Sequence, residues 1–183
     1  FPPKMLTFDE FAENIVLKSN NFKKIPGIEA NHIIYGLIKR IDPDLLKGKD
    51  FLEFMFWAGE IYSFINQLDI EDIGLKSLNN VEMSASIGYE IPSEINEILK
   101  NIGRIREEFH KIMDERKIYS RGYMYLLASR QIDKAEFNEY EDILFCGFFY
   151  LQKTEREIIK NIYSKRKASL IFQGDSDSWP ILK

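Results

Sequence analysis

The chain carries the apolar stretch EDILFCGFFYL at residues 141–151. This run of large apolar side chains predicts a buried β-strand that leads into a turn. A helix is expected to open at Thr154, because Thr154-Glu155-Arg156-Glu157 fits a capping box. A second apolar run, Ser169–Gln173, predicts another strand, which ends at Gly174–Asp177. Strand, helix and strand in this order predict a small parallel β-α-β unit.

Helical patterns fill most of the chain before this unit. Thr7 and Glu10 form a capping box for a first helix that reaches about Lys18. Pro26-Gly27 predicts a turn, and a second helix should end at Asp42-Pro43, because a residue before proline avoids helical angles. Further helices are expected at residues 51–68, at 69–80, from 92 to the break at 120–122, and at 123–132, with a loop at 81–89.

The predicted fold class is therefore mainly α, with a helical subdomain at residues 1–136 and a parallel β-α-β unit at 137–183. Two parallel strands need further strands beside them. The unit is either part of a larger parallel sheet whose other strands lie outside this sequence, or a two-stranded appendage on a helical body. The first residue is Phe1 instead of Met, which favours a longer parent protein.

Composition excludes several classes of protein. The net charge of −4 argues against a surface that coats nucleic acid throughout, although bases lead between Arg104 and Arg121 and between Lys153 and Lys167. One cysteine allows no disulfide within the chain and favours a reducing cytoplasm. No apolar run approaches the roughly 20 residues that span a bilayer, so no membrane partner is expected.

Motifs for bound cofactors are missing, and none is predicted for this chain. Gly48-Lys49-Asp50 lacks the upstream glycine and the hydroxyl of a phosphate loop, and reads as a capping loop. His32, His110 and Cys146 have no zinc spacing. Asp175 and Asp177 follow a parallel strand, where such sheets bind ligands, but turn and capping roles are favoured because no second metal-binding group is identifiable.

The block from Phe137 to Leu182 resembles the motif II to motif III region of UvrD-like superfamily-one helicases. Within it, Gly147-Phe148 followed by Leu151 and Glu155 looks like a signature of AddB-type subunits, the helicase-like, nuclease-bearing partners in bacterial double-strand-break repair complexes. Several upstream pieces are also similar to that family: residues 6–12, Phe54 with Trp57, Leu68-Asp69 with Asp72, and residues 119–125.

The resemblance implies a nucleotide site that has lost its chemistry. An active helicase needs one acid to hold magnesium and another to activate water. Cys146 and Gly147 occupy those places, and Gly174-Asp175 is not followed by the glutamine that senses the γ-phosphate. The expected fragment is therefore itself non-catalytic, within a parent that carries a separate nuclease domain and pairs with another helicase–nuclease subunit.

In that family, such a part holds single-stranded DNA, and the resemblance implies single-stranded or duplex DNA as a partner of the parent. Phosphate pairing and aromatic stacking hold single strands without sequence readout. The candidate DNA contacts are Arg104, Arg106, Lys111, Arg116, Arg121, Arg130, Tyr119 and Tyr123, with Tyr125 also considered. For the tyrosines, core packing of the helix that follows is the competing interpretation.

The alternative hypothesis is a helical module that docks a partner protein and binds no nucleic acid. Its contact residues would be Phe148, Phe149, Tyr150 and Trp179.

Overall fold

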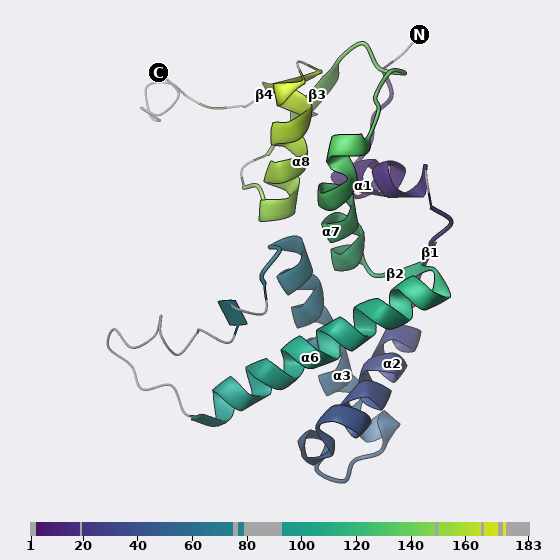
Figure 1. The fold of residues 1–183 in the computed structure, drawn as a ribbon, viewed down its shortest axis with the longest axis vertical. Helices are drawn as coiled ribbons and strands as arrows, with labels where there is room; N and C mark the ends of the chain where they lie inside the picture. The colour runs from purple at the N-terminus through teal and green to yellow at the C-terminus, as the bar shows by residue number, and fades with distance from the viewer. Residues whose placement is uncertain are drawn as a thin grey trace.

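Helices dominate the computed structural model, which confirms the mainly α prediction (Figure 1). The structure describes residues 3–18, 20–74, 77–78, 93–148, 150–165, 167–171 and 174, with the backbone alone at 93–98. The helices are α1 (Phe8–Leu17), α2 (Gly27–Ile41), α3 (Phe51–Ile70), α6 (Ser93–Arg116), α7 (Arg121–Gln131) and α8 (Lys153–Ser164), with 3₁₀ turns η1 (Pro43–Leu46) and η2 (Ile132–Lys134). The strands are β1 (Lys23–Lys24), β2 (Ile118–Tyr119), β3 (Ile143–Cys146) and β4 (Ala168–Ile171). Among the described helices, none is both long and apolar enough to cross a bilayer.

Local signals set several helix ends as expected. The Thr7–Glu10 capping box starts α1, and α2 ends at Ile41, before Asp42-Pro43. One expected boundary is different. Pro26 is the N-cap of α2 and Gly27 its first residue, so this pair starts a helix instead of making a turn. Its φ of −64° and ψ of 144° are typical of an N-cap, which needs no N–H.

Two helices also depart from their predicted bounds. The helix expected from Asp69 does not start there, because Asp69 and Ile70 complete α3; residues 75–76 and 79–80 lie outside the described part, as does the loop expected at 81–89. The α8 capping box uses Gln152 and Glu155 instead of Thr154 and Glu157. The Thr154 hydroxyl donates instead to the Ile70 carbonyl, at 2.7 Å, which takes it away from a capping role.

Strand β3 precedes α8 in the chain and β4 follows it, and the two strands pair in parallel, which confirms the β-α-β prediction. Phe145 lies opposite Leu170, and Cys146 lies opposite Ile171. The 141–151 stretch does form a strand that leads into a turn, but its predicted burial is wrong, because Phe145 is the one buried residue of the four in β3. Side chains alternate along a strand, and α8 covers one face of this sheet, which has two strands within the described residues. Leu144 and Cys146 are therefore exposed on the other face.

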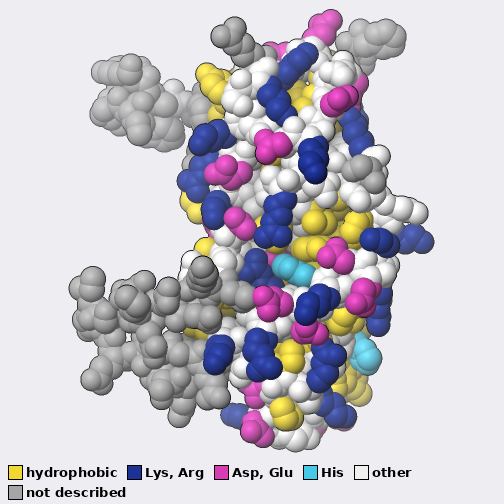
Figure 2. All heavy atoms as spheres, in the orientation of Figure 1, with side chains coloured by type: hydrophobic (Ala, Val, Ile, Leu, Met, Phe, Trp, Pro, Cys, Tyr) yellow, Lys and Arg dark blue, Asp and Glu magenta, His cyan; other side chains and the backbone are white. Residues whose placement is uncertain are grey.

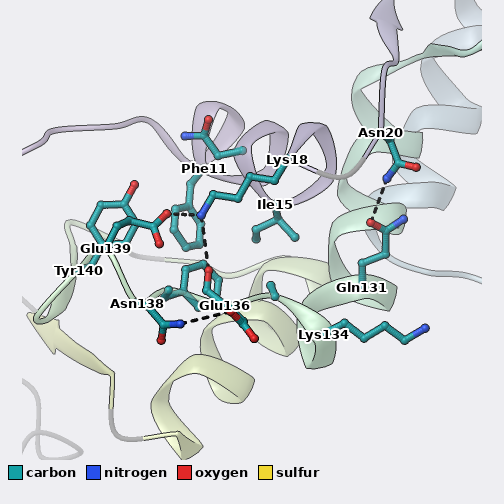
Figure 3. Close-up of a pocket in the computed structure, with 13 residues that line it drawn as sticks. Phe11, Ile15, Lys18, Asn20, Gln131, Lys134, Glu136, Asn138, Glu139 and Tyr140 are labelled. Atoms are coloured by element: carbon teal, nitrogen blue, oxygen red, sulfur yellow. Dashed lines mark hydrogen bonds and ion pairs between the residues drawn. The ribbon is translucent and has the colours of Figure 1, made fainter.

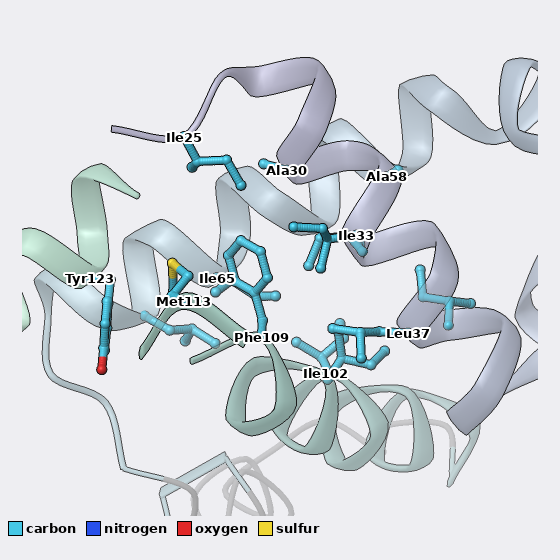
Figure 4. Close-up of a cluster of buried hydrophobic side chains, with 14 of the residues drawn as sticks. Ile25, Ala30, Ile33, Leu37, Ala58, Ile65, Ile102, Phe109, Met113 and Tyr123 are labelled. Carbon is cyan, nitrogen blue, oxygen red and sulfur yellow. The ribbon is translucent and has the colours of Figure 1, made fainter. Parts of the chain in front are cut away.

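Two hydrophobic cores hold the helices together. The first joins α2, α3 and α6, where Phe109 and Ile102 of α6 point toward Ile33 and Leu37 of α2 (Figure 4). The second joins α1, α7, α8 and the β3–β4 pair around residues such as Phe11, Tyr125, Phe145, Ile158 and Ile162. Helix α7 contributes to both cores, since Tyr123 and Leu126 belong to the first.

The packing does not divide the chain at residue 136. Phe11 of α1 stacks on Phe137 with a centroid separation of 5.8 Å and meets Phe145 edge-on. The β-α-β unit therefore shares its core with the first helix of the chain and with α7. Residues 137–171 contribute to a core but do not enclose one alone.

Polar groups at the end of α3 join it to α6 within the first core. The Arg106 guanidinium of α6 donates to Asp69 Oδ1, at 2.7 Å, and also to the carbonyls of Leu68 and Ile73. Asp69 is fully buried, and His110 Nε2 lies 3.0 Å from its second oxygen. A cation at the C-terminal end of a helix satisfies carbonyls that have no partner within the helix. This contact fixes α6 against α3.

Helix α7 approaches α3 closely at one glycine. The Gly122 N–H donates to Asn66 Oδ1 at 2.6 Å. A Cβ added at Gly122 would lie 2.5 Å from the Asn66 carbonyl oxygen and 2.6 Å from Asn66 Cα. Since these neighbours are backbone atoms, they cannot turn away as a flexible side chain would. Glycine is required here by space and not by backbone angles.

We predict that Gly122→Ala lowers the free energy of unfolding by about 3 kcal/mol, because the added methyl group forces α7 away from α3. The matched control is Gly36→Ala in α2, where an added Cβ meets nothing within 4 Å. There the change should raise the free energy of unfolding by about 1 kcal/mol, the difference in helix propensity. Urea denaturation followed by circular dichroism measures both. Equal effects of the two substitutions would contradict the close approach.

Candidate nucleic-acid contact surface

A pairing that the sequence pattern did not predict gathers basic residues from two distant segments. Strand β1 consists of Lys23 and Lys24, and it runs parallel to β2 with Lys23 opposite Ile118 and Lys24 opposite Tyr119. The Lys23 N–H donates to the Lys117 carbonyl at 2.9 Å. Arg116 ends α6 and Arg121 begins α7, on either side of β2. We call the resulting surface the basic corner: Lys23, Lys24, Arg116, Lys117 and Arg121.

All five side chains of the basic corner are exposed. Figure 1 places β1 and β2 together where α6 meets α7, and Figure 2 shows Lys and Arg side chains projecting at this edge beside acidic ones. Lys117 has a φ of 55°, which turns the chain sharply between α6 and β2. Its ammonium group lies 5.3 Å from the Phe22 ring centroid. The turn therefore holds one cation of the corner against an aromatic face.

Acidic partners offset part of this charge. Arg121 pairs with Asp9 at 3.0 Å, and Tyr125 also donates a hydrogen bond to Asp9. Burial acts to raise the pKa of Asp9, but the hydrogen bonds from Arg121 and Tyr125 and the Arg121 charge outweigh it and hold that pKa below its usual value. Arg116 lies 3.9 Å from Glu29, a loose contact. Among the described residues, no ion pair joins Lys23, Lys24 or Lys117 to an acid, although the charge of Lys24 also acts to lower the pKa of Asp9.

The predicted contacts on α6 separate into two kinds. Arg104 and Lys111 are exposed on the outer face, and Lys111 pairs with Glu108 at 2.6 Å. The hydrogen bond with Lys111 lowers the pKa of Glu108, and the same bond raises that of Lys111. Arg104 lies twelve residues before Arg116, about 18 Å along the helix. The structure therefore does not bring Arg104 into the basic corner.

Arg106 lies inside the protein. Its side chain is 7% exposed and is bound to Asp69 and to carbonyls at the end of α3. A phosphate could reach it only if those bonds broke. Arg130, by contrast, is exposed at the far end of α7, 3.7 Å from Asp72, and lies away from the basic corner.

The candidate tyrosines are buried, which agrees with their competing interpretation as core residues. Tyr119 is 5% exposed, Tyr123 4% and Tyr125 1%. Burial, with the hydrogen bond and charge of Glu13, raises the pKa of Tyr119 to about 12. Tyr123 lies against the His110 ring, with a centroid separation of 4.4 Å. These rings offer no free face on which a base could stack.

The positions of the degenerate nucleotide site lie at the carboxyl ends of β3 and β4. Cys146 is the last residue of β3 and is exposed, and Gly147 follows with a φ of 77°. Gly174 is exposed, and Asp175 and Asp177 lie outside the described residues. Within the described chain, no group of three or more His, Cys, Asp or Glu side chains is arranged to hold a metal ion.

A pocket of about 650 Å³ opens between α1 and the segment 131–140 (Figure 3). Phe11, Ile15 and Phe137 form its apolar base, and Lys18 pairs with Glu139 at its rim. Lys18 and Lys134 are balanced there by Glu136 and Glu139. None of the predicted site residues lines this pocket, and its rim carries no excess charge.

Lys23, Lys24 and Lys117 were not predicted from the sequence as DNA contacts. Two adjacent lysines form no periodic pattern. The pairing of β1 with β2 is what brings Lys23 and Lys24 close to the segment between Arg116 and Arg121. Comparisons of the chain with family models, curated proteins and solved structures found no match. The support for the candidate surface therefore comes from the charge, exposure and contacts of its residues.

The buried position of Arg106 can be tested against that of its exposed neighbour. We predict that Arg106→Leu lowers the free energy of unfolding by about 3–5 kcal/mol, because it leaves the Asp69 carboxylate buried beside His110 alone. Arg104→Leu on the outer face should change it by no more than about 0.5 kcal/mol. Urea titrations of both variants measure the difference. Similar stability of the two variants would show that the Arg106–Asp69 contact does not hold α6 to α3.

Proposed function

We propose that this chain binds single-stranded DNA through the basic corner, as the non-hydrolysing helicase-like part of a bacterial double-strand-break repair helicase–nuclease subunit. The observation that carries DNA binding is the β1–β2 pairing, which sets Lys23 and Lys24 beside Lys117. Five exposed cations on adjoining segments suit a phosphate backbone, which attracts Lys and Arg without any sequence readout.

The family part of the proposal rests on the residues at 137–182. A parallel strand pair around α8 is compatible with the expected layout of that region. Cys146 and Gly147 lie where β3 ends, and neither side chain can hold magnesium or activate water. We therefore assign DNA binding to this chain and nucleotide hydrolysis to none of its described residues.

The test of DNA binding is a titration of fluorescein-labelled oligo(dT) with the chain, followed by anisotropy at several salt concentrations. We predict that the double variant Lys23→Glu/Lys24→Glu binds more weakly and that the slope of log affinity against log salt shrinks by about 1.4, or about 0.7 for each lost phosphate contact. The charge-matched control changes exposed cations away from the corner, Lys160→Glu with Arg156→Glu in α8.

If the α8 control weakened DNA binding as much as the β1 variant, net charge alone would explain the effect. That result would contradict DNA binding at the basic corner. Absence of any binding at low salt would remove the DNA proposal itself. Circular dichroism of each variant confirms that the helices remain.

A second candidate function, docking of a partner protein without nucleic acid, is favoured by the uncovered face of the β3–β4 pair. Leu144 is 57% exposed, Ile171 49% and Tyr150 73%. Phe148 does not belong to such a surface, because it packs against Phe8 at a centroid separation of 5.7 Å. Phe149 and Trp179 lie outside the described residues. The oligonucleotide titration separates the two functions, since this candidate expects no response at low salt.

A further inference from the structure

Helix α3 exposes large apolar side chains along the side that faces away from the core. Leu52 is 74% exposed, Phe56 68%, Trp57 53% and Phe64 38%. Glu53 and Glu60 lie among them and are exposed as well. We call these six residues the α3 outer face. Single exposed apolar residues are normal on a protein surface. Four on one side of one helix form an apolar patch of the kind that marks a binding site for a partner.

The helical repeat explains why these side chains have no cover within the described chain. Phe54, Ala58 and Ile65 are buried in the first core. At about 100° per residue, Phe56 points directly away from their mean direction, with Leu52 one turn before it. Trp57 and Phe64 lie to one side of this line. From Leu52 to Phe64 the patch extends about 18 Å along the helix.

These dimensions suit a second helix laid along the first. Side chains at i, i+4, i+7 and i+11 on one face of a partner helix extend about 17 Å, close to the length of the patch. Phe and Trp side chains bury large areas and contribute most of the binding energy at such contacts. Phe56 and Trp57 already meet edge-on, with centroids 5.8 Å apart, so they offer a joint anchor.

Charge decides what kind of helix fits. Over its twenty residues α3 contains no Lys or Arg, and the charges on the outer face are Glu53 and Glu60. Glu53 is held in place by the Asp50 N–H in a capping box, so its charge stays next to the patch. These carboxylates repel nucleic acid and anionic lipid, and they attract cations that flank an apolar stripe.

We propose that the α3 outer face docks an amphipathic helix of a partner protein, one whose apolar stripe is flanked by Lys or Arg. The surface is independent of the basic corner and does not depend on the DNA proposal. A partner with acidic flanks, or a second copy of this chain, is excluded by the proposal and serves as an outcome of its test.

The test uses residues 1–183 with Trp179→Phe, so that Trp57 remains the one tryptophan. The probes are two helical peptides of about 20 residues with the same leucine stripe, one flanked by lysines and one by glutamates. The lysine peptide should shift Trp57 emission to shorter wavelength in a saturable titration. Phe56→Ser should weaken that binding about tenfold or more. Glu53→Gln/Glu60→Gln should weaken it and lessen its salt dependence.

Matched controls are Tyr163→Ser, an exposed aromatic residue of α8, and Glu157→Gln/Glu136→Gln, exposed acids elsewhere, all of which should bind the lysine peptide like the parent. Equal affinity for both peptides, or a Phe56→Ser variant that binds normally, would overturn the proposal. Sedimentation showing a dimer that Phe56→Ser dissociates would assign the face to a second copy and overturn it too. Because no oligonucleotide enters this assay, its failure leaves the DNA proposal to be judged separately.

Discussion

The fold depends on how the C-terminal end of α3 satisfies its polar groups. The last carbonyls of a helix have no partner within it. Here they are met partly by the chain that follows, since the Ile73 N–H donates to the Leu68 carbonyl, and partly from other elements, by Arg106 of α6 at Leu68 and by Thr154 of α8 at Ile70. The charge of Arg106 is compensated by buried Asp69. A single helix end thereby fixes the positions of elements from both hydrophobic cores.

The basic corner is a consequence of that junction. Arg106 holds α6 against α3, while Gly122 lets α7 approach Asn66 closely. Between these two anchored helices the chain has only Lys117 to Ser120 in which to turn. This short connection lies beside β1 and sets Lys23 and Lys24 next to it. The surface proposed for DNA is therefore held by the core and does not depend on the conformation of a long loop.

Local signals predicted what local physics determines. The Thr7–Glu10 capping box and the Asp42-Pro43 stop were read correctly, since each acts within one turn of its own helix. The burial of β3 was misjudged because an apolar run does not reveal how many neighbours a strand has. The Asp69–Arg106 pair and the β1–β2 pair join residues 37 and about 95 positions apart, and no periodicity encodes such distances. Consequently Arg106 was expected at the surface, and Lys23 and Lys24 were not considered.

Several buried polar groups of the described residues serve the packing and capping of helices. Active sites collect buried titratable groups whose pKa values are shifted for chemistry. Two buried groups of the described residues have structural partners instead: the Ser120 hydroxyl caps α7 by accepting from the Tyr123 N–H, and Glu155 accepts from the Gln152 N–H at 2.9 Å. Burial raises the pKa of Glu155, yet its carboxylate serves as half of a capping box. The two surfaces proposed to bind partners are exposed: the basic corner at β1–β2, and the α3 outer face with its apolar and acidic side chains. Surfaces of opposite charge on one small protein can select different partners without competing for either.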